Sequence, residues 1–115
     1  MQETLANIDA AFDGILFNKL VRDKIPGLIR SNGQTPVVRT LNDEEYIESL
    51  HLKLNEEVAE FHAEQNGGEL GDIMEVLFAL AETMNLSREE LLALCDEKRA
   101  KRGGFGKRQF LISRK

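Results

Sequence analysis

The chain has 115 residues, 42% hydrophobic and 30% charged, with a formal net charge of −5. This size and ordinary composition indicate one globular domain over residues 1–115, with residues 1–16 as an N-terminal extension, and they exclude a low-complexity chain. A protein whose partner is a nucleic acid polymer would be expected to be basic overall, so we expect no such partner here.

The first predicted elements are short. Residues 19–31 are typical of a short helical region that is interrupted near Pro26 and closed by Asn32-Gly33. Residues 36–41 (PVVRTL), and residues 109–113 (QFLIS) near the other end, are rich enough in β-branched or aromatic side chains to be predicted as short strands. Their pairing would give a small two-stranded appendage.

Three longer helices follow. Asn42 and Glu45 have the spacing that opens a helix, and apolar residues recur at helical spacing from there to about residue 65. Residues 66–68 (NGG) are predicted as a turn before a second helix from residue 69 to about residue 84. Ser87 and Glu90 predict a capping box for a third helix, which ends at the glycines after residue 102. The expected fold class is mainly α, a helix bundle.

Charge is unevenly distributed along this order of elements. Of the 20 acidic residues, 16 lie between Asp43 and Glu97, where only Lys53 and Arg88 are basic, and the other 13 basic residues flank that block. An acidic centre with basic arms suits a polyanion held through divalent cations. The alternative is a pair of solvated acidic helices with basic ends.

Six acidic residues stand out on the first two long helices, three on the first and three, Glu69, Asp72 and Glu75, on the second. At about 100° per residue, Glu56, Glu57 and Glu60 fall within one arc of roughly 100°, and Glu57 lies beside the apolar stripe of its helix. Glu69 and Asp72 fall one turn apart on the second helix, and Glu69 lies inside the apolar stripe. The short linker predicts an antiparallel hairpin that brings both groups to the same level.

A carboxylate on the buried side of a helix is costly to desolvate unless it is paired or binds a metal. Pairing with a lysine or arginine is the competing interpretation, but the acidic block offers only two such residues. Hard carboxylate oxygens with no histidine or cysteine at ligand spacing favour Mg²⁺, or Mn²⁺, over Zn²⁺.

Three blocks of this sequence resemble one family. Residues 56–60 (EEVAE) followed by residues 69–72 (ELGD) resemble the EExxE…ExxD signature of the MazG-like, all-α nucleotide pyrophosphohydrolases. Residues 18–26 (NKLVRDKIP) resemble the opening of one phosphoribosyl-ATP pyrophosphohydrolase-like branch, and residues 98–105 (KRAKRGGF) resemble its C-terminal end. The resemblance covers roughly residues 17–112, and the short interval between the two acidic motifs fits that branch.

The resemblance implies a MazG-like helix bundle and Mg²⁺-dependent hydrolysis of a nucleoside triphosphate to a nucleoside monophosphate and pyrophosphate. It implies metal ligation by Glu57, Glu60, Glu69 and Asp72, with Glu56 as the catalytic residue that holds a second metal or orients the attacking water as general base. The residues expected to bind substrate phosphates are all basic: Lys19, Arg22, Lys24, Lys98, Arg102 and Lys107.

Two other functions remain open: the phosphoribosyl-ATP pyrophosphohydrolase of histidine biosynthesis, and a helical interaction module without catalysis. We expect a homodimer or larger homo-oligomer, because a hairpin and one further helix leave apolar surface uncovered.

The expected compartment is the cytoplasm, without a membrane partner. No apolar run approaches the roughly 18 residues of a spanning helix, and the N-terminus lacks the pattern of a secretory signal. The single cysteine, Cys95, excludes an internal disulfide, and its place beside Leu91 and Leu92 favours a small core residue.

Overall fold

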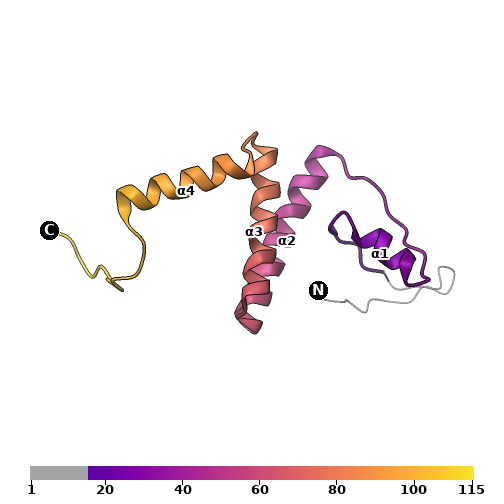
Figure 1. The fold of residues 1–115 in the computed structure, drawn as a ribbon, viewed down its shortest axis with the longest axis horizontal. Helices are drawn as coiled ribbons and strands as arrows, with labels where there is room; N and C mark the ends of the chain where they lie inside the picture. Colours follow the sequence, from indigo (N-terminus) through magenta and orange to yellow (C-terminus); the bar gives the residue numbers. More distant parts are fainter. Residues whose placement is uncertain (1–15) are drawn as a thin grey trace. The chain divides into compact units, whose positions relative to one another are not determined.

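The computed structural model describes residues 16–115, so the predicted N-terminal extension lies almost entirely outside the described part. Over this range the chain forms four helices and no strand (Figure 1). The helices are α1 (Ile25–Ser31), α2 (Asp43–Glu64), α3 (Gly67–Thr83) and α4 (Arg88–Arg102). The prediction of a mainly α fold is confirmed.

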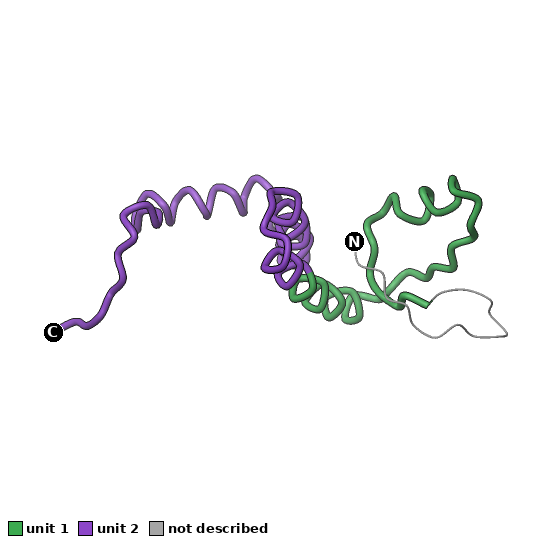
Figure 2. The backbone as a smooth tube through the Cα atoms, turned by 90° about the horizontal axis from the view of Figure 1, so that it is seen from below, with its two compact units in different colours: residues 1–56 green, residues 57–115 purple. Residues whose placement is uncertain are grey.

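The chain divides into two compact units (Figure 2). Unit 1 ends at Glu56 and unit 2 begins at Glu57, so the boundary falls inside α2. Each unit is described separately below. The interpretation of residues 1–115 as a single domain stays a prediction.

In unit 1, α1 starts later than predicted. Only residues from Ile25 onward are helical, and Pro26 stands in the first turn, where its missing N–H would have had no helical partner. The predicted interruption near Pro26 is therefore wrong, because the proline starts the helix. The end is as predicted: Gly33 adopts φ 83°, and its N–H donates to the Arg30 carbonyl at 2.9 Å.

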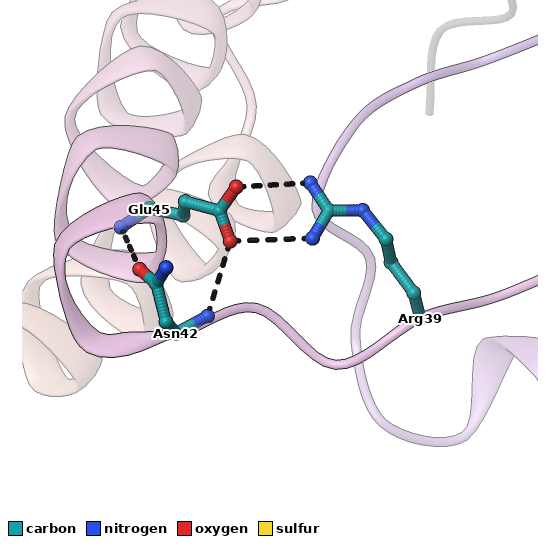
Figure 3. Close-up of polar contacts among 3 residues, drawn as sticks. All are labelled: Arg39, Asn42 and Glu45. Carbon is teal, nitrogen blue, oxygen red and sulfur yellow. Dashed lines mark hydrogen bonds and ion pairs between the residues drawn. The ribbon is translucent and has the colours of Figure 1, made fainter.

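The start of α2 is fixed by a network of side chains (Figure 3). The Glu45 N–H donates to Asn42 Oδ1 at 2.8 Å, and Glu45 Oε1 accepts from the Asn42 N–H at 3.2 Å, which is the predicted reciprocal cap. The Arg39 guanidinium donates to both Glu45 oxygens, at 3.2 and 3.1 Å. Hydrogen bonds from Arg39, and then from the Asn42 backbone, lower the pKa of Glu45.

In unit 2, the link between α2 and α3 is tighter than predicted. Gln65 adopts φ 50°, a left-handed conformation, and the Asn66 side chain accepts from the Glu69 N–H at 3.0 Å. Because Asn66 is the cap, Gly67 and Gly68 belong to the first turn of α3. The prediction that they form a turn before the helix is wrong by two residues.

The link between α3 and α4 follows the prediction. Asn85 adopts φ 62°, and the next N–H, of Leu86, donates to the Ala81 carbonyl at 2.9 Å, which closes α3 with a Schellman-type cap. Ser87 and Glu90 form the predicted capping box, with bonds of 3.1 and 2.8 Å. The Arg88 guanidinium lies 4.4 Å from the centre of the Phe78 ring, so a cation–π contact joins α4 to α3 at its first residue.

Few side chains are buried in the described part of the chain. The buried apolar residues are Leu50 in unit 1 and Val76, Phe78 and Ala81 on α3. No residue of α4 is buried, and Cys95 is exposed, so the interpretation of Cys95 as a core residue is wrong. Burial of α4 would need a covering element, which unit 2 does not provide.

The segments predicted as strands form no sheet. Residues 36–41 and 109–113 have no regular secondary structure, and the described residues contain no two-stranded appendage. A β-rich segment becomes a strand only when a neighbouring strand completes its hydrogen bonds.

No described helix is both long enough and apolar enough to cross a lipid bilayer.

Candidate metal centre

Three of the four predicted metal ligands meet in unit 2. One carboxylate oxygen from each of Glu57, Glu69 and Asp72 lies within 4.8 Å of the other two. Glu57 comes from the last two turns of α2, and Glu69 and Asp72 come from the first two turns of α3. The chain reversal at Gln65 and Asn66 therefore brings the two acidic motifs to one level, as the sequence predicts.

The cluster is partly shielded from solvent although it is anionic. Glu57 is only 7% exposed and is the one buried charged residue among those described. Oε1 of Glu69 is also buried and accepts no hydrogen bond from any described residue. A buried carboxylate oxygen left without a donor costs about 1–3 kcal/mol or more. A bound cation would satisfy this oxygen of Glu69.

The donors fit a hard divalent cation. All three ligand atoms are carboxylate oxygens, and the group contains no nitrogen or sulfur ligand, which suits Mg²⁺ or Mn²⁺ rather than Zn²⁺. Three carboxylates on two facing helix ends also leave coordination positions for water or substrate oxygens. The residues present therefore fit the cation that the sequence implies.

The fourth predicted ligand, Glu60, lies outside this group of three. It stands one helical turn after Glu57 on α2. Ligation by Glu60 stays a prediction.

Glu56 directly precedes Glu57 but has a different environment. In unit 1 its Oε2 accepts from Lys19 Nζ at 3.0 Å, and its Oε1 lies 3.1 Å from Lys53 Nζ. Burial favours the neutral acid, but hydrogen bonds from Lys19 and Lys53 outweigh it and lower the pKa of Glu56. Glu56 is thus held as a carboxylate by two half-buried lysines, and its predicted catalytic role remains a prediction.

Lys53 is one of the two basic residues that the sequence offers within the acidic block, and it pairs with Glu56. Its spacing of three residues from Glu56 was visible as a helical i, i+3 pair. Lys19 could not be found this way, because 37 positions separate it from Glu56. These side chains line a pocket of about 240 Å³ together with Asn18, Leu20, Ser49 and Leu52.

The other predicted phosphate-binding residues of unit 1 lie around the start of α1. The Arg22 carbonyl accepts from the Ile25 N–H at 3.0 Å, and Lys24 is the N-cap residue of α1. Their side chains keep the phosphate role only as a prediction.

The predicted phosphate-binding residues of unit 2 lie beyond the end of α3. Lys98 and Arg102 are on the last turns of α4, and Lys107 follows in the tail. The carboxylates are at the start of α3, which is 17 residues or about 25 Å long. Helix α4 follows the other end of α3 and runs away from α3 (Figure 1). The structure does not bring these three cations to the carboxylate cluster of the same copy.

Comparison with known proteins gives one local likeness. No family model and no solved structure matches the chain. A protein of Mycolicibacterium smegmatis (strain ATCC 700084 / mc(2)155), described as an uncharacterized protein, is 62% identical over 45 residues. The match covers 39% of this chain and 46% of that protein, so the chain spans less than half the length of the relative.

Proposed function

We propose that this chain is a divalent-metal-dependent hydrolase that cleaves a nucleoside triphosphate into a nucleoside monophosphate and pyrophosphate. The observation that carries the proposal is the partly buried group of three carboxylates, with oxygens within 4.8 Å of one another, at the turn between α2 and α3. The resemblance of its two acidic motifs to MazG-like nucleotide pyrophosphohydrolases supports the same chemistry.

In this proposal Glu57, Glu69 and Asp72 hold Mg²⁺, and Glu60 on the next turn of α2 adds a ligand when the nucleotide is present. The bound cation supplies charge neutralisation on the phosphate oxygens and so eases attack on the phosphoanhydride. The burial of Glu57 reduces competition from bulk water and strengthens its hold on a cation.

For Glu56 the lowered pKa argues against the general-base role and leaves the roles of holding a second metal or orienting a water molecule. A carboxyl group whose pKa is lowered accepts a proton poorly, so its use as a general base is disfavoured at neutral pH. A permanent negative charge is suited to holding a second cation or to orienting a water molecule. We therefore propose that Glu56 contributes charge and orientation.

The proposed enzyme acts as a homodimer or larger homo-oligomer. On α3, Leu70, Met74 and Leu77 are 48%, 42% and 38% exposed and recur at helical spacing, so they form an uncovered apolar stripe. A second copy that covers this stripe would complete the fold.

The direct test is a hydrolysis screen with Mg²⁺ in which pyrophosphate and orthophosphate are measured separately. Ordinary nucleoside triphosphates are compared with phosphoribosyl-ATP, and Glu69→Gln is the matched variant, because it removes one charge from the cluster and keeps the shape. We expect pyrophosphate release by the natural chain and none by the variant. Faster hydrolysis of phosphoribosyl-ATP would make it the substrate in place of a nucleoside triphosphate. Mg²⁺ binding without any hydrolysis would favour the helical interaction module.

A further inference from the structure

The C-terminal arm, defined here as α4 with the tail of residues 103–115, carries apolar side chains that nothing in unit 2 covers. In the tail, Phe105, Phe110, Leu111 and Ile112 are 98%, 88%, 81% and 88% exposed. Single exposed apolar residues are ordinary, but three consecutive ones with a further phenylalanine five residues earlier make this segment unusually apolar for an exposed tail. An exposed apolar segment of this kind is suited to a contact with another molecule.

The tail end of the arm is also strongly basic. From Lys98 to Lys115 the chain has eight basic residues and no acidic one. In the tail the Arg108 N–H donates to the Phe105 carbonyl at 3.0 Å, and Arg108 itself adopts φ 57°. This turn directs the chain into the segment that carries Phe110 and its neighbours.

The start of the arm is acidic and carries a groove. A groove of about 330 Å³ on α4 is lined by Leu86, Ala93 and Leu94 and by two carboxylates, Glu90 and Glu97. The carboxylates are seven residues apart and so lie on the same face of the helix. An apolar floor with an acidic rim is the complement of an apolar tail with arginines and lysines.

The tail does not occupy the groove of its own copy, because its apolar side chains are almost fully exposed. The arm of a single copy therefore carries both the apolar, basic tail and the groove with its two carboxylates, and the two do not contact each other. When a surface carries both halves of a contact, two copies related by a two-fold axis make that contact twice. Antiparallel arms would also set the acidic start of each α4 beside the basic end of the other.

We propose that two copies of this chain exchange C-terminal arms, the tail of each copy placing Phe110 in the α4 groove of the other with Arg108 facing Glu97. The proposal deepens the homo-oligomer of the proposed function and rests on that part alone, so it does not depend on hydrolysis. The occupant of the groove is a second copy because the charges of the arm are self-complementary.

A charge exchange tests this arrangement with the full-length chain. Glu97→Arg and Arg108→Glu each place like charges in both contacts of a homodimer, so each variant alone should dimerise at least about tenfold more weakly in sedimentation equilibrium. In an equimolar mixture the heterodimer has one natural contact and one contact in which both charges are reversed, so both contacts are attractive. We expect the mixture to recover the dimer affinity of the natural chain.

A second measurement examines the apolar part of the contact. Phe110→Ser with Ile112→Ser should weaken the dimer at least about tenfold, because the groove loses its apolar occupant. Val37→Ser is the matched control, since Val37 is 77% exposed and lies outside the arm, and it should leave the affinity unchanged. Circular dichroism checks that all variants keep their helices.

Each other outcome contradicts the proposal in a distinct way. A monomeric natural chain would overturn both arm exchange and the homo-oligomer. A dimer that persists in the Phe110 and Ile112 variant would overturn arm exchange and leave the oligomer standing. Recovery in the Glu97→Arg, Arg108→Glu double variant but not in the mixture would show that the tail folds back on its own copy.

Discussion

Glu56 and Glu57 are consecutive on α2 and meet opposite electrostatic conditions. Glu56 is held by ammonium groups at 3.0 and 3.1 Å, whereas Glu57 is 7% exposed and has two further carboxylates within 4.8 Å of it. One helical step of about 100° separates a carboxylate held by two lysines from one that lies close to two other carboxylates. The comparison teaches that two carboxylates of the same acidic motif can differ in their neighbours, so the motif alone does not give the role of each residue.

The largest expected effect concerns the carboxylate cluster. Asp72→Asn keeps the shape of the side chain but removes one charge from the group of three. We expect turnover to fall on the order of a thousandfold, because removal of one metal-site group commonly costs several kcal/mol of transition-state stabilisation. Steady-state kinetics measures the loss, and circular dichroism verifies the fold. Turnover near that of the natural chain would show that the metal assignment is wrong.

A smaller effect is expected for the melting temperature without metal, and its sign should differ between Glu69 and Glu56. Glu69→Gln relieves charge repulsion in the cluster and should raise the melting temperature in EDTA, while abolishing the rise that Mg²⁺ causes in the natural chain. Glu56→Gln breaks two ion pairs and should lower the melting temperature. Differences of about 1 kcal/mol correspond to roughly 4–8 °C in a domain of this size.

The same pair of variants gives its own control, because both replace a glutamate by the isosteric amide. Thermal unfolding with and without Mg²⁺ measures the signs. If both variants lose stability in EDTA, repulsion within the cluster is not the dominant force there.

The smallest effect is on the pH dependence. The lysines lower the pKa of Glu56 below its ordinary value of 4.5, so the stability that it contributes is present above that value and is lost as pH falls through the folded-state pKa. The difference in melting temperature between the natural chain and Glu56→Gln should therefore be present at neutral pH and shrink in acid. A difference that grows on acidification would contradict the pKa direction.

Local signals in the sequence were sufficient for the long helices and for most of the carboxylate cluster. The caps at Asn42 and Ser87 depend on hydrogen bonds three residues away, so their spacing predicts them directly. The apolar stripes predicted that Glu57 and Glu69 face inward, and the short linker predicted that they meet. These features need only neighbours within one helical hairpin.

What the sequence could not predict depends on distant or absent neighbours. The contact of Lys19 with Glu56 joins residues 37 positions apart and has no local pattern. Cys95 was predicted as a core residue from the apolar residues beside it, but burial needs a second surface, and α4 has none in unit 2. The residues of 109–113 have β propensity without a partner strand, for the same reason.

A small change of angle between α3 and α4 moves the far end of α4 by a large distance. The contact of Arg88 with Phe78 is at the first residue of a helix that is 15 residues, or about 22 Å, long. A tilt of about 10° at the joint would displace the far end of this rod by about 4 Å. Substitutions that disturb the left-handed conformation of Asn85 would therefore be felt mainly at the distal end of the rod, while both helices keep their own hydrogen bonds.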